Sequence, residues 1–330
     1  IPCWGPPKES AQLEASKEFA KQFLVRHGIP TGGYAGVESI EEARIAIGGK
    51  FPTVLKFDGL AAGKGVAVCP DVESAESFLR EVLAERKFGA GRLLVEEFLE
   101  GPEISIFASV VDQEYQILAP ARDYKRIGDG DEGPNTGGMG AVSSLEMLDD
   151  ALRSAIDDRI VRPTVAGLVA DGLPYRGFLY FGLMLTQDGP KVIEYNCRFG
   201  DPEAEAVLPM VRGDFATYLF EAAKGNLRPD LISFAPGWSI CLVSASAGYP
   251  ATSRAGDLIS GLDQVREARI FHAGTRRNAA GQYETNGGRV LVVTASGATR
   301  AEAVTRAYAE SSKIDFAGRQ QRTDIGTRNF

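Results

Sequence analysis

The spacing of apolar residues predicts a chain that alternates between helices and strands. Apolar residues recur at helical spacing from Leu13 to Leu24, which predicts a helix over residues 9–27 that Gly28 would end. Further helices are expected over residues 72–86, 145–170 with a kink at Pro163, 213–225 and 300–313. Strands are expected over residues 53–57, 66–69, 92–99, 103–111, 238–244, 248–250, 269–272 and 289–294.

A predicted β-hairpin stands at the centre of this pattern. Two apolar runs, over residues 178–185 and from residue 191, flank an Asp-Gly pair that favours a tight turn. Side chains two apart on a strand share a face, so Glu194 and Asn196 are expected side by side, with Arg198 next if the strand continues. Such oxygen ligands suit Mg²⁺ bound with substrate phosphates, and a guanidinium suits a carboxylate or phosphate. The pattern fits either a site where an anion meets a nucleotide or a hairpin whose polar face is only solvated.

A glycine-rich segment over residues 58–65 separates the strands predicted at 53–57 and 66–69. A Walker A loop has four residues between its first glycine and the Gly-Lys pair, and a Ser or Thr after the lysine. Here only three residues separate Gly59 from the Gly-Lys pair, Gly65 follows Lys64 and a strand comes next, so this is not a Walker A loop. A glycine-rich loop between strands can lie over phosphates while Lys64 supplies positive charge. The alternative is a flexible hairpin tip.

Three other polar features are candidates for binding. Lys17 lies beside the apolar stripe of the first helix, where a lysine commonly extends from the edge of a packed face. Glu96 and Glu97 end a strand, where carboxylates can bind ribose hydroxyls or an exocyclic amine, or can be solvated. Residues 120–141 are read as a long polar connection that carries charges of both signs, and such a loop is either functional or mobile.

Length, charge and cysteine use limit the class of protein. A chain of 330 residues suggests two or three domains, and the short strands after residue 228 are typical of a separate α+β domain. The net charge of -8, without a basic run, makes nucleic acid an unexpected partner. The four cysteines are far apart, which disfavours structural zinc and indicates a reducing compartment such as the cytoplasm. Neither a membrane-spanning stretch nor a signal peptide is apparent, and because the first residue is Ile we expect a cut or processed front.

Together these motifs resemble the ATP-grasp fold and, more narrowly, the phosphoribosylamine–glycine ligases, also known as glycinamide ribonucleotide synthetases. A lysine-bearing glycine-rich hairpin, a V-E-E-F-L segment and an I-E-Y-N strand follow one another in the order of that fold. The carrying stretches are G-L-A-A-G-K-G-V from Gly59, P-N-T-G-G-M-G-A from Pro134, E-Y-N-C-R-F-G-D-P-E from Glu194, F-H-A-G-T from Phe271 and G-G-R-V-L from Gly287. They extend over nearly the whole chain.

The resemblance implies an α+β architecture in which two subdomains sandwich ATP. The ATP-grasp domain would occupy residues 1–228 with a mobile lid at about 49–98, and a smaller α+β domain would occupy residues 229–330. The family also begins with a small α/β domain that helps to bind phosphoribosylamine, and the chain is expected to start just after it.

The same resemblance implies an ATP-dependent carboxylate–amine ligase. ATP would convert glycine to glycyl phosphate, and 5-phosphoribosylamine would attack it to give glycinamide ribonucleotide, ADP and phosphate in purine biosynthesis. Mg²⁺, with Mn²⁺ as an alternative, and the catalytic Lys64 would offset charge on the transferring phosphoryl group, and a closed lid would exclude water.

Specific residues are carried over position by position. The expected nucleotide-binding residues are Lys17, Lys56, Gly59, Gly63, Lys64, Gly65, Glu96, Leu99 and Glu103. The expected metal ligands are Glu194 and Asn196. The residues expected to face glycine and its acyl phosphate are Asp123, Asn135, Thr136, Gly137, Gly138 and Arg198, of which Asp123 and Arg198 are also expected to be catalytic.

Three departures from the family pattern keep alternatives open. The strand before Glu194 carries no further metal-binding carboxylate, Asn286 stands where the family often has His, and Pro7 stands where it often has Ser. The alternatives are another ATP-grasp carboxylate–amine ligase, or a nucleotide-binding fragment without full ligase activity. The expected partners are small-molecule substrates, with neither nucleic acid nor membrane, and the expected state is a monomer.

Overall fold

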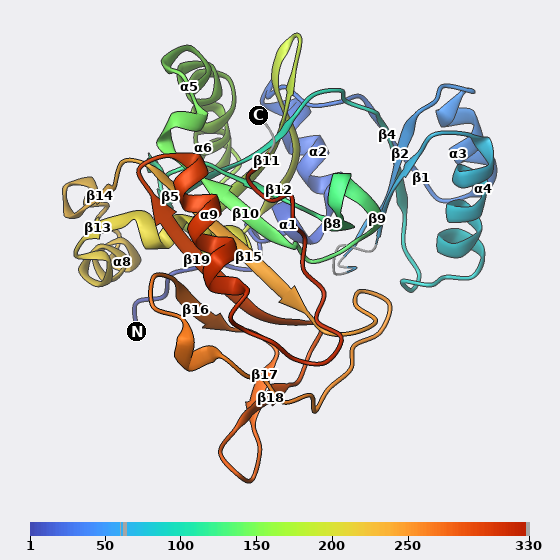
Figure 1. Ribbon diagram of the computed structural model, residues 1–330. Helices are drawn as coiled ribbons and strands as arrows, with labels where there is room; N and C mark the ends of the chain where they lie inside the picture. Colours follow the sequence, from blue (N-terminus) through green and yellow to red (C-terminus); the bar gives the residue numbers. More distant parts are fainter. Residues whose placement is uncertain (60, 62–64, 328–330) are drawn as a thin grey trace. The chain divides into compact units, whose positions relative to one another are not determined.

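The computed structural model describes residues 1–59, 61 and 65–327, and it shows a mixed α+β chain (Figure 1). Contacts divide the chain into two compact units. Unit 1 comprises Ile1–Leu118, Asp150–Arg198 and Ala216–Arg228, and unit 2 comprises Ala119–Asp149, Phe199–Phe215 and Pro229–Phe330. The last break coincides with the predicted boundary after residue 228, whereas the others fall inside the predicted ATP-grasp domain. The domain scheme of residues 1–228 and 229–330 stays a prediction.

Unit 1 contains the α-helices from α1 to α6, nearly all of α8, and two groups of strands. Its helices are α1 (Gln12–Ala15), α2 (Lys17–Arg26), α3 (Ile40–Ile47), α4 (Val72–Leu79), α5 (Asp150–Ile156), α6 (Arg162–Ala170) and all but the first residue of α8 (Phe215–Lys224), with π-helical turns η1 (Arg80–Ala84) and η4 (Asp157–Val161). Its strands are β1 (Tyr34–Val37), β2 (Thr53–Phe57), β3 (Val66–Cys69), β4 (Leu93–Glu97), β5 (Glu103–Val111), β6 (Glu114–Ile117), β11 (Arg176–Thr186) and β12 (Gly189–Asn196). Among the described residues no helix is long and apolar enough to cross a membrane.

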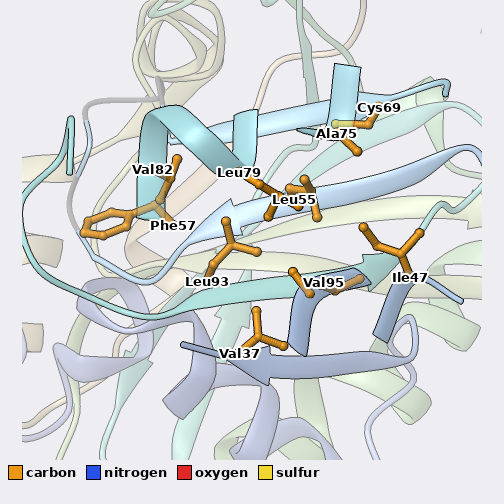
Figure 2. Close-up of a cluster of buried hydrophobic side chains, with 11 residues drawn as sticks. Val37, Ile47, Leu55, Phe57, Cys69, Ala75, Leu79, Val82, Leu93 and Val95 are labelled. Carbon is orange, nitrogen blue, oxygen red and sulfur yellow. The ribbon is translucent and has the colours of Figure 1, made fainter. Parts of the chain in front are cut away.

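The first group of strands forms a four-stranded sheet with its own core. The strand order is β1-β4-β2-β3, and α3 and α4 pack their apolar residues on one face (Figure 2). Leu55 and Leu93, from neighbouring strands, are both fully buried beneath Leu79 of α4. The predicted lid over residues 49–98 coincides with most of this sheet, although β1 and α3 precede it. Its mobility stays a prediction.

The predicted central hairpin is confirmed. β11 and β12 pair antiparallel around the Asp188-Gly189 turn, and β11 also pairs with β5. The register of β11 and β12 shifts between Gly182 and Leu183, which leaves Ile193 as an extra residue in β12. Glu194 follows this bulge, so Glu194 and Asn196 still alternate with the buried Tyr195 and share one face.

Unit 2 is built around an antiparallel sheet in which β7, β10, β15, β19 and β16 are neighbours in that order. Its strands are β7 (Ala121–Asp123), β8 (Arg126–Gly128), β9 (Glu132–Asn135), β10 (Gly140–Ser143), β13 (Val211–Gly213), β14 (Ile232–Phe234), β15 (Trp238–Ala245), β16 (Arg269–His272), β17 (Thr275–Arg277), β18 (Tyr283–Thr285) and β19 (Arg289–Gly297). Its helices are α7 (Glu203–Val207) and α9 (Arg300–Ser311), with short 3-10 turns η2 (Asp129–Asp131), η3 (Leu145–Met147), η5 (Leu208–Met210), η6 (Pro229–Leu231) and η7 (Leu262–Gln264).

Both faces of this sheet are buried. Ile240 and Leu242 of β15 pack with Ala303 and Ala307 of α9, whereas the intervening Cys241 packs with Ala206 of α7. Because successive side chains of a strand point to opposite faces, the two helices must cover opposite sides of the sheet. The run of apolar residues in β15 is therefore continuous rather than alternating.

Several sequence-based predictions of elements are wrong in detail. The helix predicted over residues 9–27 is divided at Ser16, whose backbone is extended and whose hydroxyl caps Phe19 N–H of α2. The helix predicted over 145–170 begins at Asp150 and contains a π-helical turn before Pro163, which sits in the first turn of α6. Residues 120–141 contain four strands rather than a plain polar loop, and residues 248–250 form turns.

Candidate active site

A buried cluster of three charged side chains lies in unit 1. Lys21 of α2 and Lys56 of β2 both contact one oxygen of Glu96, with Nζ–Oε2 distances of 2.9 Å and 3.0 Å. Each of these side chains is at most 6% exposed. One carboxylate thus offsets two ammonium groups, and burial lowers the pKa of Lys21 while its contact with Glu96 opposes that shift.

Backbone carbonyls and a hydroxyl group accept further hydrogen bonds from these lysines. Lys21 donates to the Thr31 hydroxyl at 2.8 Å, and Thr31 donates in turn to the carbonyl of Val192 at 2.7 Å. Lys56 donates to the carbonyl of Ile193 at 3.2 Å. That carbonyl belongs to the extra residue of the β12 bulge, so an irregularity in the hairpin provides an acceptor for a buried cation.

Glu96 keeps one oxygen without a partner. Its Oε2 contacts both lysines, but Oε1 is buried and has no hydrogen-bond partner within the described structure. A buried carboxylate oxygen normally accepts a hydrogen bond, and an orphaned one is costly unless a ligand supplies the donor. Leu99 follows β4 and is half-buried, and Glu103 opens β5. The predicted roles of these residues toward a nucleotide stay predictions.

Lys17 faces the glycine-rich segment. Its ammonium donates to the carbonyl of Gly59 at 3.0 Å, and Asp58 accepts hydrogen bonds from the hydroxyl of Ser16 and the amide of Glu18. Burial lowers the pKa of Lys17, and the carboxylate of Glu194 is the strongest opposing influence. Lys17 and Glu194 are therefore electrostatic neighbours, which the sequence could not show.

The rest of the glycine-rich segment is only partly described. Gly63 and Lys64, both predicted to bind phosphates, lie outside the described residues. Gly65 accepts a backbone hydrogen bond from Phe57 at 2.7 Å, which closes the β2–β3 hairpin. A Cβ at Gly65 would lie 2.7 Å from that of Ala61, so a side chain is excluded there by packing.

The predicted metal ligands share one face of β12, where both side chains are half-buried. Glu194 lies opposite Gly182. A Cβ added at Gly182 would come within 3.1 Å of the Glu194 side chain, so the glycine leaves room for the glutamate. Arg198 donates to Asn196 Oδ1 at 3.4 Å and contacts Glu14 at 3.4 Å. One carboxylate and one amide oxygen fit a hard cation that takes its other ligands from phosphates and water. No group of three His, Cys, Asp or Glu side chains suited to a metal occurs among the residues with described positions.

In unit 2 the loop predicted to bind glycine is held in place by hydrogen bonds to other residues of the chain. The amide and hydroxyl of Thr136 both donate to the carbonyl of Lys125, at 2.7 Å and 2.8 Å, and the amide of Gly138 donates to Thr136 Oγ1 at 2.9 Å. The amide of Gly137 donates to the hydroxyl of Tyr249 at 2.8 Å. These amides have protein acceptors, so the loop is ordered without an anion. Its role in glycine binding stays a prediction.

The glycines of this loop permit close approach by neighbouring protein atoms. Gly138 has a φ of +107°, and a Cβ there would lie 2.4 Å from the Pro202 ring. Asn135 ends β9 opposite Arg126, and Asp123 ends β7 opposite Ala141. The loop and Asp123 thus belong to connected strands of unit 2. The glycines are predicted from the sequence to lie near an anion, and in the structure they also permit this close packing.

Lys21 is the main residue of the unit 1 site that the sequence analysis missed. It lies four residues after Lys17 on α2, and residues at this spacing share a helix face. The signal was therefore available, because a second lysine on a largely apolar face needs a counter-charge once buried. Thr31, which connects Lys21 to β12, gave no recognisable pattern.

Comparisons with known proteins agree with this arrangement. Residues 15–204 match the family model of the phosphoribosylglycinamide synthetase ATP-grasp (A) domain, and residues 239–328 match that of the C domain. The chain is 45% identical to the phosphoribosylamine–glycine ligase of Vibrio parahaemolyticus and 46% identical to that of Escherichia coli, in each case over 99% of this chain and 78% of the relative.

Solved structures give the same result. The crystal structure of phosphoribosylamine–glycine ligase from Thermotoga maritima superposes with a TM-score of 0.87 at 37% identity, over 97% of this chain and 81% of that one. A biotin carboxylase from Campylobacter jejuni, at 17% identity, has a TM-score of 0.72 over 96% of this chain and 70% of that one, which shows the shared ATP-grasp fold alone. The chain therefore belongs to the phosphoribosylglycinamide synthetase family, as an ATP-dependent ligase that joins glycine to 5-phosphoribosylamine through glycyl phosphate in purine biosynthesis.

Proposed function

We propose that the buried cluster of Lys21, Lys56 and Glu96 forms the floor of the nucleotide site. The observation that supports this most directly is the orphaned Oε1 of Glu96, which needs a donor such as the exocyclic amine of adenine. Leu99 would offer its backbone to the same base, and Glu103 would accept from the ribose. Lys56 would be held ready for a phosphate by its contact with Glu96 at 3.0 Å.

A second group would bind the phosphates. As an ATP-grasp ligase the chain uses ATP with a divalent metal ion, and we propose Mg²⁺, with Mn²⁺ as an alternative, held by Glu194 and Asn196. Bound there, the metal would offset negative charge on the transferring phosphoryl group. Lys17 would stand beside Glu194, and Lys64 with the backbone of Gly59, Gly63 and Gly65 would cover the phosphates.

We further assign glycine to Asp123, to the loop Asn135–Gly138 and to Arg198. The carboxylate of Asp123 would suit the ammonium group of glycine, and the guanidinium of Arg198 would suit its carboxylate. The support is chemical, because a zwitterion needs one anion and one cation. Arg198 is 56% exposed in its side chain and can reach solvent.

The chemistry then requires two bond exchanges. A glycine carboxylate oxygen attacks the γ-phosphorus of ATP, and ADP leaves. The neutral amine of 5-phosphoribosylamine next attacks the carbonyl carbon of glycyl phosphate, and phosphate leaves as the amide forms and the amine loses a proton. Because water would hydrolyse glycyl phosphate, a lid over residues 49–98 would have to close during the first step.

Hydroxylamine provides the test, because it intercepts an acyl phosphate as a hydroxamate. The full chain supplied with ATP, Mg²⁺, glycine and hydroxylamine should form glycine hydroxamate, and replacing hydroxylamine by 5-phosphoribosylamine should give glycinamide ribonucleotide. Asp123→Asn should lower hydroxamate formation while ATP still binds. Binding of ATP without either product would favour a nucleotide-binding role, and activation of a different carboxylate would favour another ATP-grasp ligase.

The remaining assignments concern the setting of the reaction. The substrates are small molecules, and we propose that the chain acts as a monomer in the cytoplasm without nucleic acid or membrane partners. Support comes from the net charge of -8 and from the four cysteines, all of which are free thiols. Gel filtration with light scattering would contradict the monomer if it gave a dimer mass.

A further inference from the structure

Arg289, the first residue of β19, connects three separate segments of unit 2. Its Nη1 donates to the carbonyl of Gly137 at 2.6 Å and to the carbonyl of Asp201 at 3.1 Å. Its Nη2 donates to the carboxylate of Asp201 at 2.8 Å. A single planar guanidinium thus joins the loop before β10 and the segment before α7 to the start of β19, a strand inside the sheet.

The same residue of the loop is also held through its backbone amide. The amide of Gly137 donates to the hydroxyl of Tyr249 at 2.8 Å, while its carbonyl accepts from Arg289. Tyr249 can take this position because its neighbour is Gly288, where a Cβ would lie 2.4 Å from the tyrosine ring. Both hydrogen-bonding groups of Gly137 are therefore fixed by residues from the C-terminal part of the chain.

Steric limits make this arrangement specific. A Cβ at Gly137 would lie 3.1 Å from the guanidinium carbon of Arg289, and a Cβ at Gly138 would lie 2.4 Å from the Pro202 ring. The two glycines therefore bring the loop backbone into direct contact with Arg289 and with the residue after Asp201. The Arg289 side chain is only 21% exposed, so solvent competes weakly for its hydrogen bonds.

We propose that Arg289, assisted by Tyr249, is a positioning residue for the ligation reaction. It fixes the backbone of Gly137 and Gly138, and so holds the loop Asn135–Gly138 in the one conformation that receives glycine and its acyl phosphate. The proposal rests on the assignment of this loop to glycine. Arg289 itself touches neither the nucleotide nor the metal ligands in this role, and it acts through the loop.

The role predicts a selective kinetic effect. Arg289→Lys keeps the positive charge, but one ammonium cannot reproduce a fork that bonds two carbonyls and a carboxylate. We expect the KM for glycine to rise by at least about tenfold, with the KM for ATP and the melting temperature close to wild type. Tyr249→Phe removes only the acceptor of the Gly137 amide, and should raise the same KM by a smaller factor.

The experiment measures hydroxamate formation by the full chain, first with glycine varied and then with ATP varied. Arg276→Lys is the matched control, because Arg276 is 56% exposed and pairs with Glu284 on the β17–β18 hairpin. It should change neither KM. Adding guanidinium ion at low concentration to Arg289→Ala should restore part of the glycine dependence, which a merely structural loss would not allow.

Thr136→Ala separates failure of this proposal from failure of the function assigned to the loop. A higher KM for glycine in Thr136→Ala, together with an unchanged value in Arg289→Lys and Tyr249→Phe, would overturn the role of Arg289 but leave the loop its function. Unchanged values in all three variants would overturn both. Equal losses toward ATP and glycine would show that Arg289 only stabilises the fold. If Arg289→Lys fails to fold, Tyr249→Phe decides the question by the same comparison.

Discussion

The carboxylate of Glu96 balances two buried positive charges. Two buried lysines share its Oε2, while its other oxygen has no partner within the described structure. Burying charges is costly, and the cost is offset only when they are paired and hydrogen-bonded. A buried carboxylate oxygen without a donor adds to this cost, and a hydrogen-bond donor on a ligand at Oε1 would offset it. Because Glu96 already loses its contact with water when the chain folds, ligand binding does not have to remove that water, and the affinity for the ligand is higher.

Replacing Glu96 should lower the free energy of unfolding. Glu96→Gln leaves Lys21 and Lys56 buried without a counter-charge, so we expect a loss of about 3–5 kcal/mol in the free energy of unfolding. Glu97→Gln is the control, because Glu97 is its exposed neighbour and accepts from the amide of Gly33. Urea unfolding measures the difference. Equal, small losses in both variants would show that the cluster carries little energy.

Glu194→Gln should separate catalysis from folding. An amide is a poor substitute for a carboxylate as a ligand of Mg²⁺, so ATP turnover with glycine should fall by at least about a hundredfold. Glu194 is half-buried at one end of β12, and its removal should shift the melting temperature little. Asp188→Asn, in the exposed turn of the same hairpin, should leave turnover unchanged. Unchanged turnover in Glu194→Gln would remove this residue from the metal site.

Residue-level prediction from the sequence was uneven for physical reasons. Glu194 and Asn196 were expected on one face because a strand alternates, and the bulge at Ile193 preserves this alternation by falling before them. The spacing of Lys21 from Lys17 was a local signal, but its partner Glu96 is far away in sequence, and no local pattern shows where a buried counter-charge lies. The contact between Arg289 and Gly137 was missed for the same reason.

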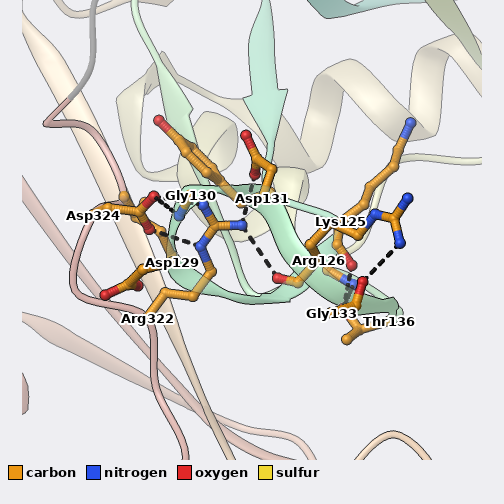
Figure 3. Close-up of polar contacts among 12 residues, drawn as sticks. Lys125, Arg126, Asp129, Gly130, Asp131, Gly133, Thr136, Arg322 and Asp324 are labelled. Atoms are coloured by element: carbon orange, nitrogen blue, oxygen red, sulfur yellow. Dashed lines mark hydrogen bonds and ion pairs between the residues drawn. The ribbon is translucent and has the colours of Figure 1, made fainter.

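At the scale of elements, the β8–β9 hairpin shows how a polar segment becomes structured. Arg322 is completely buried and donates to Asp131 at 2.8 Å, to the carbonyl of Arg126 at 3.2 Å and to both oxygens of Asp324 (Figure 3). Its guanidinium also lies 4.9 Å from the ring centroid of Tyr124. Arg322, from the last part of the sequence, thus provides the buried contacts that the β8–β9 hairpin itself lacks.

This explains why residues 120–141 were predicted as a loop. The strands β8 and β9 carry few apolar residues, so neither periodicity nor strand propensity was visible. Their order comes from a charge network with a partner near the other end of the chain, which single-sequence patterns do not report. The hairpin of β11 and β12 was predicted well because its apolar runs and its Asp-Gly turn are both local signals.

The Arg322 network should be visible in acid. Burial tends to raise the pKa of Asp324, but hydrogen bonds from Arg322 and from the amide of Gly130 dominate and hold it at about 2, below the ordinary 3.8. A depressed carboxyl pKa contributes stability that is complete above the unfolded value and disappears as the pH falls through the folded value. Asp324→Asn should therefore be less stable at neutral pH by on the order of 2 kcal/mol, and the difference should shrink between about pH 4 and pH 2.

Urea unfolding at a series of pH values measures this effect. Asp257→Asn provides the comparison, because Asp257 pairs with the exposed Arg254, where solvent screens the interaction. Its effect should be smaller at every pH. A loss in Asp324→Asn that does not change with pH would mean that the network acts through packing alone.

At the scale of the whole molecule, the family and the fold were readable from sequence because five long motifs occur in a fixed order. The α+β class was confirmed, and so were most strands whose patterns are local. The contact-based units were not readable, because unit 2 collects residues from three separate parts of the chain. Pairing of distant segments depends on three-dimensional packing, which apolar periodicity does not encode.

Ligand-dependent hydrogen exchange across the whole chain is the last prediction. The four-stranded sheet with α3 and α4 has its own buried core, so it can move as a body while its internal contacts persist. If it is a lid, Mg-ATP should slow exchange in the backbone amides of residues 49–98, and adding glycine should then slow exchange near Asn135–Gly138 in unit 2.

Glu194→Gln supplies the control for this experiment. Slowing of exchange in residues 49–98 should be weaker in that variant at the same ATP concentration, because the metal that helps to hold the phosphates would be lost. Exchange in β15 and β19 should not respond, since these central strands are buried on both faces. If Mg-ATP protects all strands equally, the ligand stabilises the molecule globally and the lid interpretation is wrong. If it protects none, nucleotide binding at Lys56 and Glu96 is wrong as well.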